Sequence, residues 1–422
     1  MERRGHVVVI SYPATGHTNP MLQFSKNLAS RGLLVTFVNF NFNHSRIMQA
    51  KESVQRLKLD IRFECIPDGL PQGDLAQDTN INPAVFKHMQ DNMDGSGLEH
   101  LINRLNASAD APPVSCIIYN SFLPWICLKI GIAEERWDWD SSRMPESVTI
   151  PDLPELKLWE LPSPFRDTTG FLNYYLRQFE SVRDASWVIA NTFYELEHEM
   201  IDSIRGKGVP FLSIGPSIPS VFLDGRNPED TQWERIHGKR RTVWNGWRSR
   251  RRCRCGQRFV WVIRPPPGHA HIGEVLPAGF LEENERKGLV VEWCIQLEVL
   301  SHPSVGVFMS HCGWNSTLDA LSLGIPMLTL GIWTDQPTNS KFVADVWKTG
   351  LKLRAGEDGV VGREEIERCM RLAVDGIGEQ GKKLRNNALK WRNLCRSAAS
   401  EGGSSDINMN QLVDDIVAKA KE

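Results

Sequence analysis

Polar side chains around residue 311 follow an order that suits the binding of a phosphate group. Residues 305–309 are mostly apolar and predict a buried strand, and His311 comes just after its end. Asn315 and Ser316 then stand at the start of a predicted helix over residues 315–323. The first turn of a helix presents backbone N–H groups and the positive end of the helix dipole, which suit a diphosphate. Since ligands of open α/β sheets bind at the carboxyl ends of strands, the pattern predicts an anion site here.

Two further kinds of side chain near this segment suit the rest of a nucleotide sugar. An indole such as Trp293 can stack on a flat base. Asp335 and Gln336 together supply acceptors and donors for sugar hydroxyls. An Asn or Ser before a helix is most often an ordinary N-cap, however, so these residue types alone do not separate a ligand site from local helix capping.

The N-terminal segment holds a second candidate. Residues 7–10 predict a first core strand, and Pro20 suits the first turn of the helix that follows, with Thr18 or Asn19 as its cap. His17 is therefore expected on a loop at the carboxyl end of the first strand. Taken alone, a loop histidine is more often solvated or packed than functional.

The elements that must position these residues alternate along the whole chain. The expected strands cover residues 7–10, 34–38, 61–65, 114–119, 289–292, 305–309 and 326–328. The expected helices cover residues 19–30, 44–57, 83–105, 315–323, 336–347 and much of the chain from 363 onward, including 406–421. Such alternation predicts one parallel sheet per half, with helices on both faces. Residues 215–230, with three prolines, are the expected linker between domains 1–215 and 216–400.

Composition sets the class of protein. The length of 422 residues fits two domains of about 200 residues each, and 41% hydrophobic with 24% charged residues is typical of a globular protein. A formal net charge of −2 argues against nucleic acid and acidic membrane as partners. No apolar run reaches the roughly 18 residues of a membrane span. Nine cysteines without paired spacing indicate reduced thiols and a cytoplasmic location.

The window of residues 293–336 resembles the plant secondary product glycosyltransferase box in length and in nearly all diagnostic positions. The chain is thereby identified as a member of the plant family-1 UDP-glycosyltransferases. The resemblance implies an α/β fold of the GT-B type, with two doubly wound parallel-sheet domains facing a cleft. It also implies that the last segment, residues 401–422, is a helix that packs back on the N-terminal domain. A monomer is expected.

By the same resemblance, side chains of the box are assigned to parts of the donor: Trp293 to uracil, Gln296 to the uridine end, His311, Asn315 and Ser316 to the diphosphate, Trp314, Asp335 and Gln336 to the sugar, and Asp319 to the ribose. A closing Gln is usual in members that use glucose, so UDP-glucose is the expected donor. The family has Glu at the position of Asp319, where it bridges the ribose hydroxyls, and the shorter Asp is expected to reach them through a longer contact or water. Gly331 stands where Pro is usual. No metal or cofactor is expected.

Residues 16–20 read Gly-His-Thr-Asn-Pro and resemble the family's N-terminal motif, whose histidine is the general base. This assigns to His17 the proton abstraction of an inverting sugar transfer. Many members support the histidine with Asp in a Tyr-Asp-Ser-Phe-x-Pro-Trp context, where this chain has Asn120. An amide can orient an imidazole but cannot neutralise the imidazolium that forms.

The departure at Asn120 bears on the acceptor. A carboxylic acid is already ionised at neutral pH, so an ester-forming enzyme depends less on a charged pair. Residues 37–42, 61–71 and 259–422 resemble the branch of the family that glucosylates small carboxylic acids and phenols. The expected acceptor is therefore a small lipophilic acid or phenol.

Two segments do not match the family. Residues 126–150 replace an expected helix, strand and acceptor-pocket segment, and residues 231–256 stand where a central strand ending in Ser-Phe-Gly-Ser is usual. Losing a central parallel strand would leave ladder hydrogen bonds unmade. Two alternatives to an active enzyme therefore stay open: an inactive homologue that still binds UDP, and a product of a damaged gene that does not fold.

Three weaker motifs point to other chemistry. Asp138 and Asp140 have the Asp-x-Asp spacing of a metal site, and Cys253 with Cys255 supplies half of a zinc site. Such pairs are common by chance. The basic tract of residues 235–258, with its interleaved Trp side chains, has a composition that attracts phosphate backbones, but a solvated loop is the commoner explanation.

Overall fold

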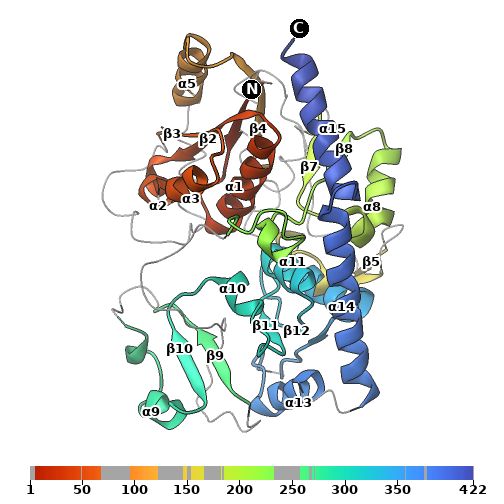
Figure 1. Cartoon of the computed structure of the whole chain (residues 1–422). Helices are drawn as coiled ribbons and strands as arrows, with labels where there is room; N and C mark the ends of the chain where they lie inside the picture. Colours follow the sequence, from red (N-terminus) through yellow and green to blue (C-terminus); the bar gives the residue numbers. More distant parts are fainter. Residues whose placement is uncertain are drawn as a thin grey trace. The chain divides into compact units, whose positions relative to one another are not determined.

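The computed structural model describes residues 5–48, 50–67, 96–121, 146–149, 154–165, 182, 185–231, 257–265, 269, 271–356, 358–374 and 378–421. The chain divides into two compact units. The first unit comprises Met1–Trp139, Gly170–Glu234 and Ala398–Glu422, and the second comprises Asp140–Thr169 and Arg235–Ser397. Both combine parallel strands with helices (Figure 1).

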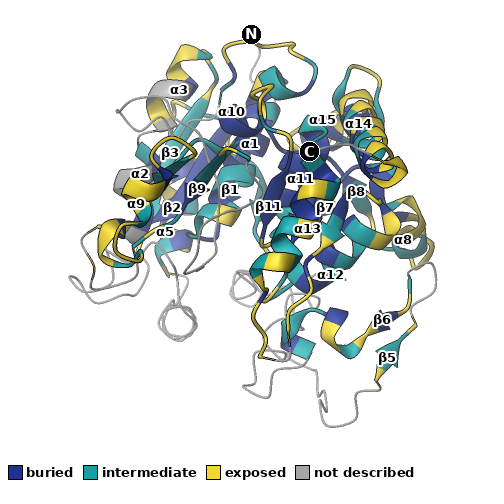
Figure 2. Cartoon of the chain, turned by 90° about the horizontal axis from the view of Figure 1, so that it is seen from below, coloured by how far each residue is buried: buried dark blue, intermediate teal, exposed yellow. Residues whose placement is uncertain are grey.

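The main sheet of the first unit is parallel and has the strand order β3-β2-β1-β4. Its strands are β1 (His6–Ile10), β2 (Leu34–Phe40), β3 (Ile61–Ile66) and β4 (Val114–Tyr119). The four strands predicted in this half are thus confirmed. Every residue of β1 and β2 is buried (Figure 2). Burial on both faces explains why these strands read as continuous apolar runs rather than as alternating ones.

Helices cover both faces of this sheet. The helices of the first unit are α1 (Thr15–Ser30), α2 (His44–Met48), α3 (Ala50–Arg56), α5 (Ser96–Asn106), α8 (Tyr194–Gly206) and α15 (Ser404–Lys419). Val7 and Val9 of β1 lie in one core cluster with apolar side chains of α1 and α15. Val8 and Ile10 lie in a second cluster with those of α5. The alternation follows from the two-residue repeat of a strand.

The C-terminal helix α15 connects this sheet with a smaller one. Strand β7 (Val188–Ala190) pairs in parallel with β8 (Phe211–Ser213). Helix α15 contacts both β4 and β8, and its Leu412 lies fully buried in the cluster that also receives side chains of β1, β4, β7 and β8. Asn408 Nδ2 also donates a hydrogen bond to Ser213 O at 2.7 Å. The last helix is therefore part of the core of the first unit.

The expected linker of residues 215–230 is packed on the first unit. The carboxylate of buried Asp230 accepts hydrogen bonds from Gln23 Nε2 at 2.9 Å and from Ser220 N at 2.9 Å, and it pairs with buried Lys26 at 3.3 Å. Burial lowers the pKa of Lys26, while Asp230 opposes that shift. A buried charge needs such a partner. The structure therefore divides the chain later than the expected boundary between residues 215 and 216.

The second unit contains separate short sheets. Its strands are β5 (Ser147–Val148), β6 (Leu156–Lys157), β9 (Phe259–Val262), β10 (Gly288–Val291), β11 (Phe308–Ser310), β12 (Met327–Thr329) and β13 (Gly350–Lys352). Within the described residues, β9 pairs in parallel only with β10, while β11, β12 and β13 form another parallel sheet. Both of these sheets are parallel, as predicted for this half of the chain. Residues 232–256, which include the place of the family's Ser-Phe-Gly-Ser strand, lie outside the described residues.

The helices of the second unit pack against both of its parallel sheets. They are α9 (Phe280–Asn284), α10 (Gln296–Leu300), α11 (Trp314–Leu323), α12 (Gln336–Lys341), α13 (Arg363–Val374) and α14 (Glu379–Ala399), the last running into the first unit at its end. Helix α9 packs against β10, and α13 packs against β12 and β13. Met309 of β11 and Leu328 of β12 pack with buried Met370 and Ala373 of α13. This core fixes the sheet whose carboxyl end carries the candidate donor residues.

Local hydrogen bonds explain where element ends differ from the predictions. Strand β11 starts at Phe308 rather than at residue 305 because Val305 N–H is bound to His302 O in a turn. The predicted helix over residues 336–347 consists of α12 and a π-helical turn, Phe342–Val346. The predicted helix over residues 44–57 is divided into α2 and α3.

Several sequence features lie outside the described residues. They are the start of the predicted helix 83–105, residues 122–125 of the Asn120 motif, the Asp138 and Asp140 pair, the Cys253 and Cys255 pair, and nearly all of the basic tract. In the part of the chain that is described, no helix is both long and apolar enough to cross a membrane. The same residues include no group of three or more His, Cys, Asp or Glu arranged to hold a metal ion.

The role of α15 in the first core predicts a large loss of stability for Leu412→Ala. Deleting a fully buried leucine side chain should lower the free energy of unfolding by about 2–5 kcal/mol. The measurement is the midpoint of urea unfolding. Asp414→Ala on the exposed side of the same helix is the control and should change it by less than about 0.5 kcal/mol. Equal effects of the two variants would contradict the packing described for α15.

Candidate functional site

Pairing of β1 with β4 brings His17 and Asn120 together. The two strands are parallel neighbours with Ile10 opposite Tyr119, and Asn120 N–H continues the ladder to Ile10 O at 3.1 Å. The chain leaves β1 and enters α1 at the same edge of the sheet, and the side chain of Asn120 forms a hydrogen bond with the imidazole of His17. Two residues a hundred positions apart in the sequence thus form a pair at the carboxyl end of the sheet.

The surroundings keep the His17 ring uncharged at neutral pH. Withdrawal of the ring from water lowers its pKa to about 4, and the hydrogen bond with Asn120 only partly opposes this shift. The ring of Tyr12, itself buried, meets the imidazole edge-on with centroids 5.0 Å apart. A neutral imidazole in this position can accept a proton.

His17 lies in the first turn of α1 and not on a loop, which corrects the sequence prediction. The N–H groups of His17 and Thr18 both bind Ala14 O at 2.9 Å, so the helix starts at Thr15. The N-cap is Ala14, whose methyl group cannot accept a hydrogen bond, and the predicted cap Thr18 instead donates its hydroxyl to Tyr12 O at 3.2 Å. The predicted cap Asn19 lies inside the helix with Pro20.

In the second unit, three predicted donor residues form one hydrogen-bonded group. Gln296 Nε2, at the start of α10, donates to Asp319 Oδ2 at 2.8 Å and to Ser316 Oγ at 3.2 Å. Ser316 and Asp319 are one helical turn apart on α11, which places both side chains on the same face. The structure therefore brings Gln296 together with residues that lie 20 and 23 positions later in the sequence.

The carboxyl group of Asp319 is in an unusual state. It is buried, and burial raises its pKa to about 7, with the hydrogen bond from Gln296 as a weaker opposing influence. Near neutral pH the group is therefore divided between its acid and its carboxylate form. In this structure the Oδ2 atom of Asp319 accepts its hydrogen bond from Gln296 Nε2.

His311 lies against the start of α11. The helix begins at Trp314 with Gly313 as its cap, so Asn315 and Ser316 lie in its first turn, as predicted, and not at the N-cap position that is the commoner place for these residue types. A Cβ atom at Gly313 would lie only 2.6 Å from His311 Nε2, so the ring can occupy this place only because residue 313 is glycine. Desolvation of the ring lowers the pKa of His311, while the negative charge of Asp335 opposes this shift. His311 and the first turn of α11 thus share one small region.

Asp335 and Gln336 are held in a loop that leads into α12. Asp335 Oδ1 accepts a hydrogen bond from Thr334 Oγ1 at 2.9 Å, and its Oδ2 accepts one from Asn339 Nδ2. Gln336 Oε1 accepts from Trp333 N at 3.1 Å and Ile332 N at 3.3 Å. The loop thus engages the oxygen of this amide, while Gln336 Nε2 forms no hydrogen bond with the described residues.

Asn339 was missed by the sequence reasoning. Its Nδ2 also donates to Cys312 O at 2.9 Å, and it thereby connects the loop before α12 with the turn before α11. Cys312 has a positive φ of 63°, which is unusual for a residue other than glycine. The signal that could have identified Asn339 is its spacing of four from Asp335, which places both side chains on one face of a helix.

Gly331, which had no interpretation in the sequence, has a structural one. A Cβ atom here would collide with the carbonyl oxygen of Gln336 and with the backbone nitrogen of Pro337. The loop before α12 therefore closes on itself through a backbone approach that a side chain would prevent. The usual Pro of the family cannot occupy the same conformation.

The two tryptophans of the box have different surroundings. Trp314 packs its indole toward Trp347, with ring centroids 6.2 Å apart, in a group that also includes Phe342 and Trp391. Trp293 is half-buried and follows β10 closely. The Trp314 ring is thus packed against another aromatic side chain of the protein.

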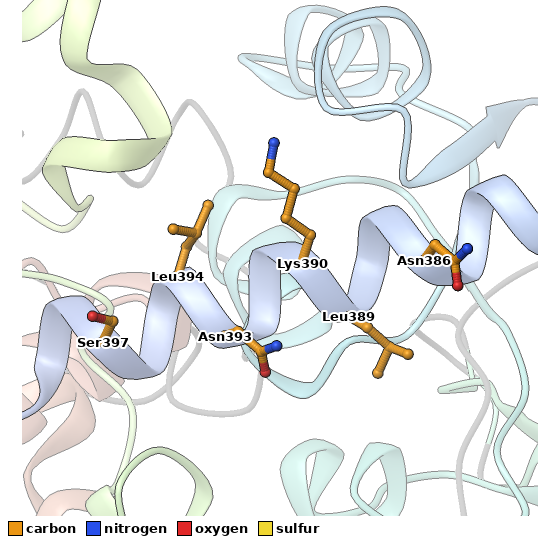
Figure 3. Close-up of a pocket in the computed structure, with 6 residues that line it drawn as sticks. All are labelled: Asn386, Leu389, Lys390, Asn393, Leu394 and Ser397. Atoms are coloured by element: carbon orange, nitrogen blue, oxygen red, sulfur yellow. The ribbon is translucent and has the colours of Figure 1, made fainter.

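A groove in the second unit lies along α14, outside the candidate site. Its lining consists of Asn386, Leu389, Lys390, Asn393, Leu394 and Ser397 (Figure 3). All six belong to this one helix. None of the predicted site residues lines it.

Comparison with known proteins identifies the family. A model described as UDP-glucoronosyl and UDP-glucosyl transferase matches residues 254–357, and a glycosyltransferase N-terminal domain model matches residues 5–62. Flavonol 7-O-beta-glucosyltransferase UGT74F1 of Arabidopsis thaliana is 34% identical over 464 aligned positions, which cover 99% of each chain. The chain belongs to the plant family-1 UDP-glycosyltransferases. It is a glycosyltransferase that acts with a UDP-sugar and a small-molecule acceptor.

Further relatives of this UDP-glycosyltransferase support the assignment. UDP-glycosyltransferase 75C1 of Solanum lycopersicum is 34% identical, with 97% of this chain and 98% of that protein covered. The alignment with the Arabidopsis protein is longer than the 422 residues of this chain, so that relative has residues without a counterpart here.

Solved structures establish the GT-B fold. Os79 from O. sativa in complex with UDP superposes with a TM-score of 0.79 at 27% identity, covering 97% of this chain and 100% of that chain. TcCGT1 in complex with UDP gives a TM-score of 0.75 at 20% identity, which speaks for the fold alone. The UDP-glycosyltransferase described here therefore has the expected fold class.

The raised pKa of Asp319 predicts an unusual pH dependence of stability. Because its pKa is higher in the folded than in the unfolded protein, the folded state holds an extra proton between about pH 4 and pH 7. Stability should therefore fall as the pH rises through this window, by roughly 2–3 kcal/mol between pH 5 and pH 8. Asp319→Asn should lose this part of the dependence and gain stability over the wild type at pH 8.

The measurement is urea unfolding of the unliganded protein at both pH values. Asp414→Asn, at an exposed position in the first unit, is the control and should keep the wild-type difference between pH 5 and pH 8. If Asp319→Asn also keeps that difference, the carboxyl group is not protonated in the folded protein at pH 5.

Proposed function

We propose that this chain transfers glucose from UDP-glucose, with inversion, to a small lipophilic carboxylic acid or phenol. The observation that carries the proposal is the neutral imidazole of His17, held by Asn120 at the carboxyl end of the first sheet. An uncharged ring with one nitrogen fixed by an amide is prepared to accept a proton on the other nitrogen. An amide partner suits acceptors that need little help with deprotonation.

The donor is proposed to bind to the second unit. His311 and the backbone N–H groups in the first turn of α11, at Asn315 and Ser316, would hold the diphosphate, since a helix start attracts anions. Trp293 and Gln296 would contact the uridine, and Asp319 the ribose. Such a site needs neither metal nor cofactor, because the positive end of the helix supplies the stabilisation of the leaving UDP.

The sugar is proposed to contact Asp335 and Gln336, whose hydrogen-bonded loop offers a carboxylate and an amide N–H to hydroxyl groups. Because the Trp314 indole packs toward Trp347, a sugar contact from this residue would come from its backbone N–H. The name of the Arabidopsis relative, a glucosyltransferase, supports glucose as the sugar.

The transfer is a single displacement at the anomeric carbon. The acceptor oxygen forms the new bond from the face opposite to UDP, the bond between the anomeric carbon and the phosphate oxygen breaks, and UDP leaves with the bonding electrons. His17 takes the proton of a phenol during this step. A carboxylate brings no proton, so for that acceptor His17 has none to remove.

Asn120 also favours a second candidate, an inactive homologue that binds UDP. An amide cannot compensate the imidazolium charge, which is the step where an Asp partner would act. A product that does not fold remains the third possibility. A cytoplasmic location is proposed because the nine cysteines of the sequence lack paired spacing, and a monomer is proposed.

A thermal melt with and without UDP-glucose separates these possibilities. At a ligand concentration of about a hundred times the dissociation constant, binding should add roughly 2.7 kcal/mol to the free energy of unfolding. A cooperative melt that moves upward, followed by product formation with acceptors, is the expected result. A shift without turnover would identify the inactive homologue, and the absence of a cooperative transition would identify a chain that does not fold.

His17→Ala should abolish transfer to a phenol because the variant lacks the imidazole that is proposed to take the proton. UDP binding, measured by calorimetry, should stay unchanged since the donor residues lie on another unit. The control is His198→Ala on α8, away from the motif residues. Phenol turnover that survives in His17→Ala would remove His17 from the mechanism.

The low pKa of His17 predicts the pH profile. For a phenol, kcat/KM should stay flat from pH 8 down and fall only near pH 4, where the ring becomes charged. Asn120→Asp should raise the pKa of His17, move this acid limb upward and increase phenol turnover about tenfold or more at pH 8. Turnover of a carboxylic acid should change much less. An acid limb near pH 6.5 in the wild type would contradict the lowered pKa of His17.

A further inference from the structure

A short segment from the N-terminal half of the chain belongs to the second unit. Residues 154–165 contain β6 and two single 3₁₀ turns, Leu158–Glu160 and Ser163–Phe165. They precede residues 170–234 of the first unit in sequence, yet they pack with residues 235–397. We call residues 154–165 the strap. Its contacts are with the loop and helix that carry Asp335 and Gln336.

Ser163 holds Thr334 by two reciprocal hydrogen bonds. Ser163 N–H donates to Thr334 O at 2.8 Å, and Thr334 N–H donates to Ser163 Oγ at 2.8 Å. Thr334 has a positive φ of 51°, which is costly for a β-branched residue. Such a conformation persists only where its surroundings fix it. The Ser163 side chain therefore supplies one of the bonds that keep Thr334 in this form.

Glu160 provides a second attachment of the strap. Its backbone oxygen accepts a hydrogen bond from Thr338 Oγ1 at 2.6 Å, and its buried carboxylate lies 3.1 Å from Lys341 Nζ and 3.5 Å from Lys352 Nζ. Burial raises the pKa of Glu160, but the N–H of Lys157 and the two lysines outweigh this, and the pKa is below its ordinary value. The strap thus holds α12 by a charged group and the preceding loop by Ser163.

The contacts continue from Thr334 toward the other donor residues. Thr334 Oγ1 donates to Asp335 Oδ1, and Asn339 connects Asp335 Oδ2 with Cys312 O before α11. One series of hydrogen bonds therefore runs from Ser163 through Thr334 and Asp335 to the turn beside His311. A change at Ser163 acts first on the orientation of Asp335 and of the adjacent Gln336.

We propose that Ser163 is a positioning residue that orients Asp335 and Gln336 toward the sugar of the donor. The inference rests on the proposed function, in which these two residues contact the sugar. The residues proposed for uridine and diphosphate, such as Gln296 and Ser316, hydrogen-bond to each other on α10 and α11 and not to the strap. Loosening the loop should therefore weaken binding of the sugar and leave binding of UDP unchanged.

The experiment compares the dissociation constants of UDP and UDP-glucose by calorimetry. Ser163→Ala removes the acceptor for Thr334 N–H and keeps the Ser163 backbone bond. It should weaken UDP-glucose binding about tenfold and change UDP binding by less than about twofold. Ser163→Thr keeps the hydroxyl and should restore the wild-type ratio. Ser30→Ala, which removes an exposed hydroxyl of α1 in the first unit, is the matched control.

A second variant, Thr334→Gly, tests the proposal if Ser163→Ala does not fold. Thr334→Gly removes the hydrogen bond to Asp335 and relieves the positive φ, so it should fold and should also weaken UDP-glucose binding selectively. Unchanged binding of both ligands in the folded variants would overturn the proposal, as would an equal loss for UDP and UDP-glucose. If the wild type binds UDP, but binds UDP-glucose no more tightly than the variants do, the positioning role fails while the donor site stands. If the folded wild type binds neither, the proposed function fails and the role of Ser163 fails with it.

Discussion

Parallel strand pairing is the constraint on which both candidate sites depend. In the first unit, β1 and β4 end side by side, and Asn120 N–H binds Ile10 O just where the chain turns toward His17. In the second unit, β11 and β12 end side by side, and Leu330 N–H binds Ser310 O in the same way. The turns after these strands must therefore meet at one edge. Each pairing therefore brings residues that are far apart in the sequence to the same candidate site.

Close backbone approach is the second requirement of the donor region. Gly313 lets His311 lie against the start of α11, and Gly331 lets the loop before α12 close on the carbonyl of Gln336. The positive φ values of Cys312 and Thr334 add conformational cost in the same two turns. The surrounding bonds from Asn339 and Ser163 offset this cost. The two turns are thus strained segments held in place by more distant residues.

Two departures from the family stand at central positions, and one of them removes a charge. Asn120 gives His17 an amide in place of the family's carboxylate, whereas Asp319 keeps the carboxyl group on a shorter side chain, buried against Gln296 with a pKa raised to about 7. An amide gives less electrostatic support to a protonated imidazole. The raised pKa of Asp319 makes the charge of this region depend on pH near neutrality. The described residues of the second unit form the β9-β10 pair and the β11-β12-β13 sheet, and His311 follows the end of β11.

The sequence by itself determined the strands of the first sheet and, through the glycosyltransferase box of residues 293–336, the family. Those conclusions depend on local patterns: buried strands read as apolar runs, and the box has fixed residue types at fixed spacing. Helix starts were predicted less well, because backbone bonds to Ala14 and the cap at Gly313 decided them, and neither shows in side-chain chemistry.

Only the tertiary structure decided that Asn339, Glu160 and Ser163 support the loop and helix that carry Asp335 and Gln336, that Gly331 has a steric role, and that α15 joins two sheets. These roles arise from contacts between segments far apart in the chain. Such contacts depend on strand register and packing between distant segments, and a local pattern of residues does not predict these.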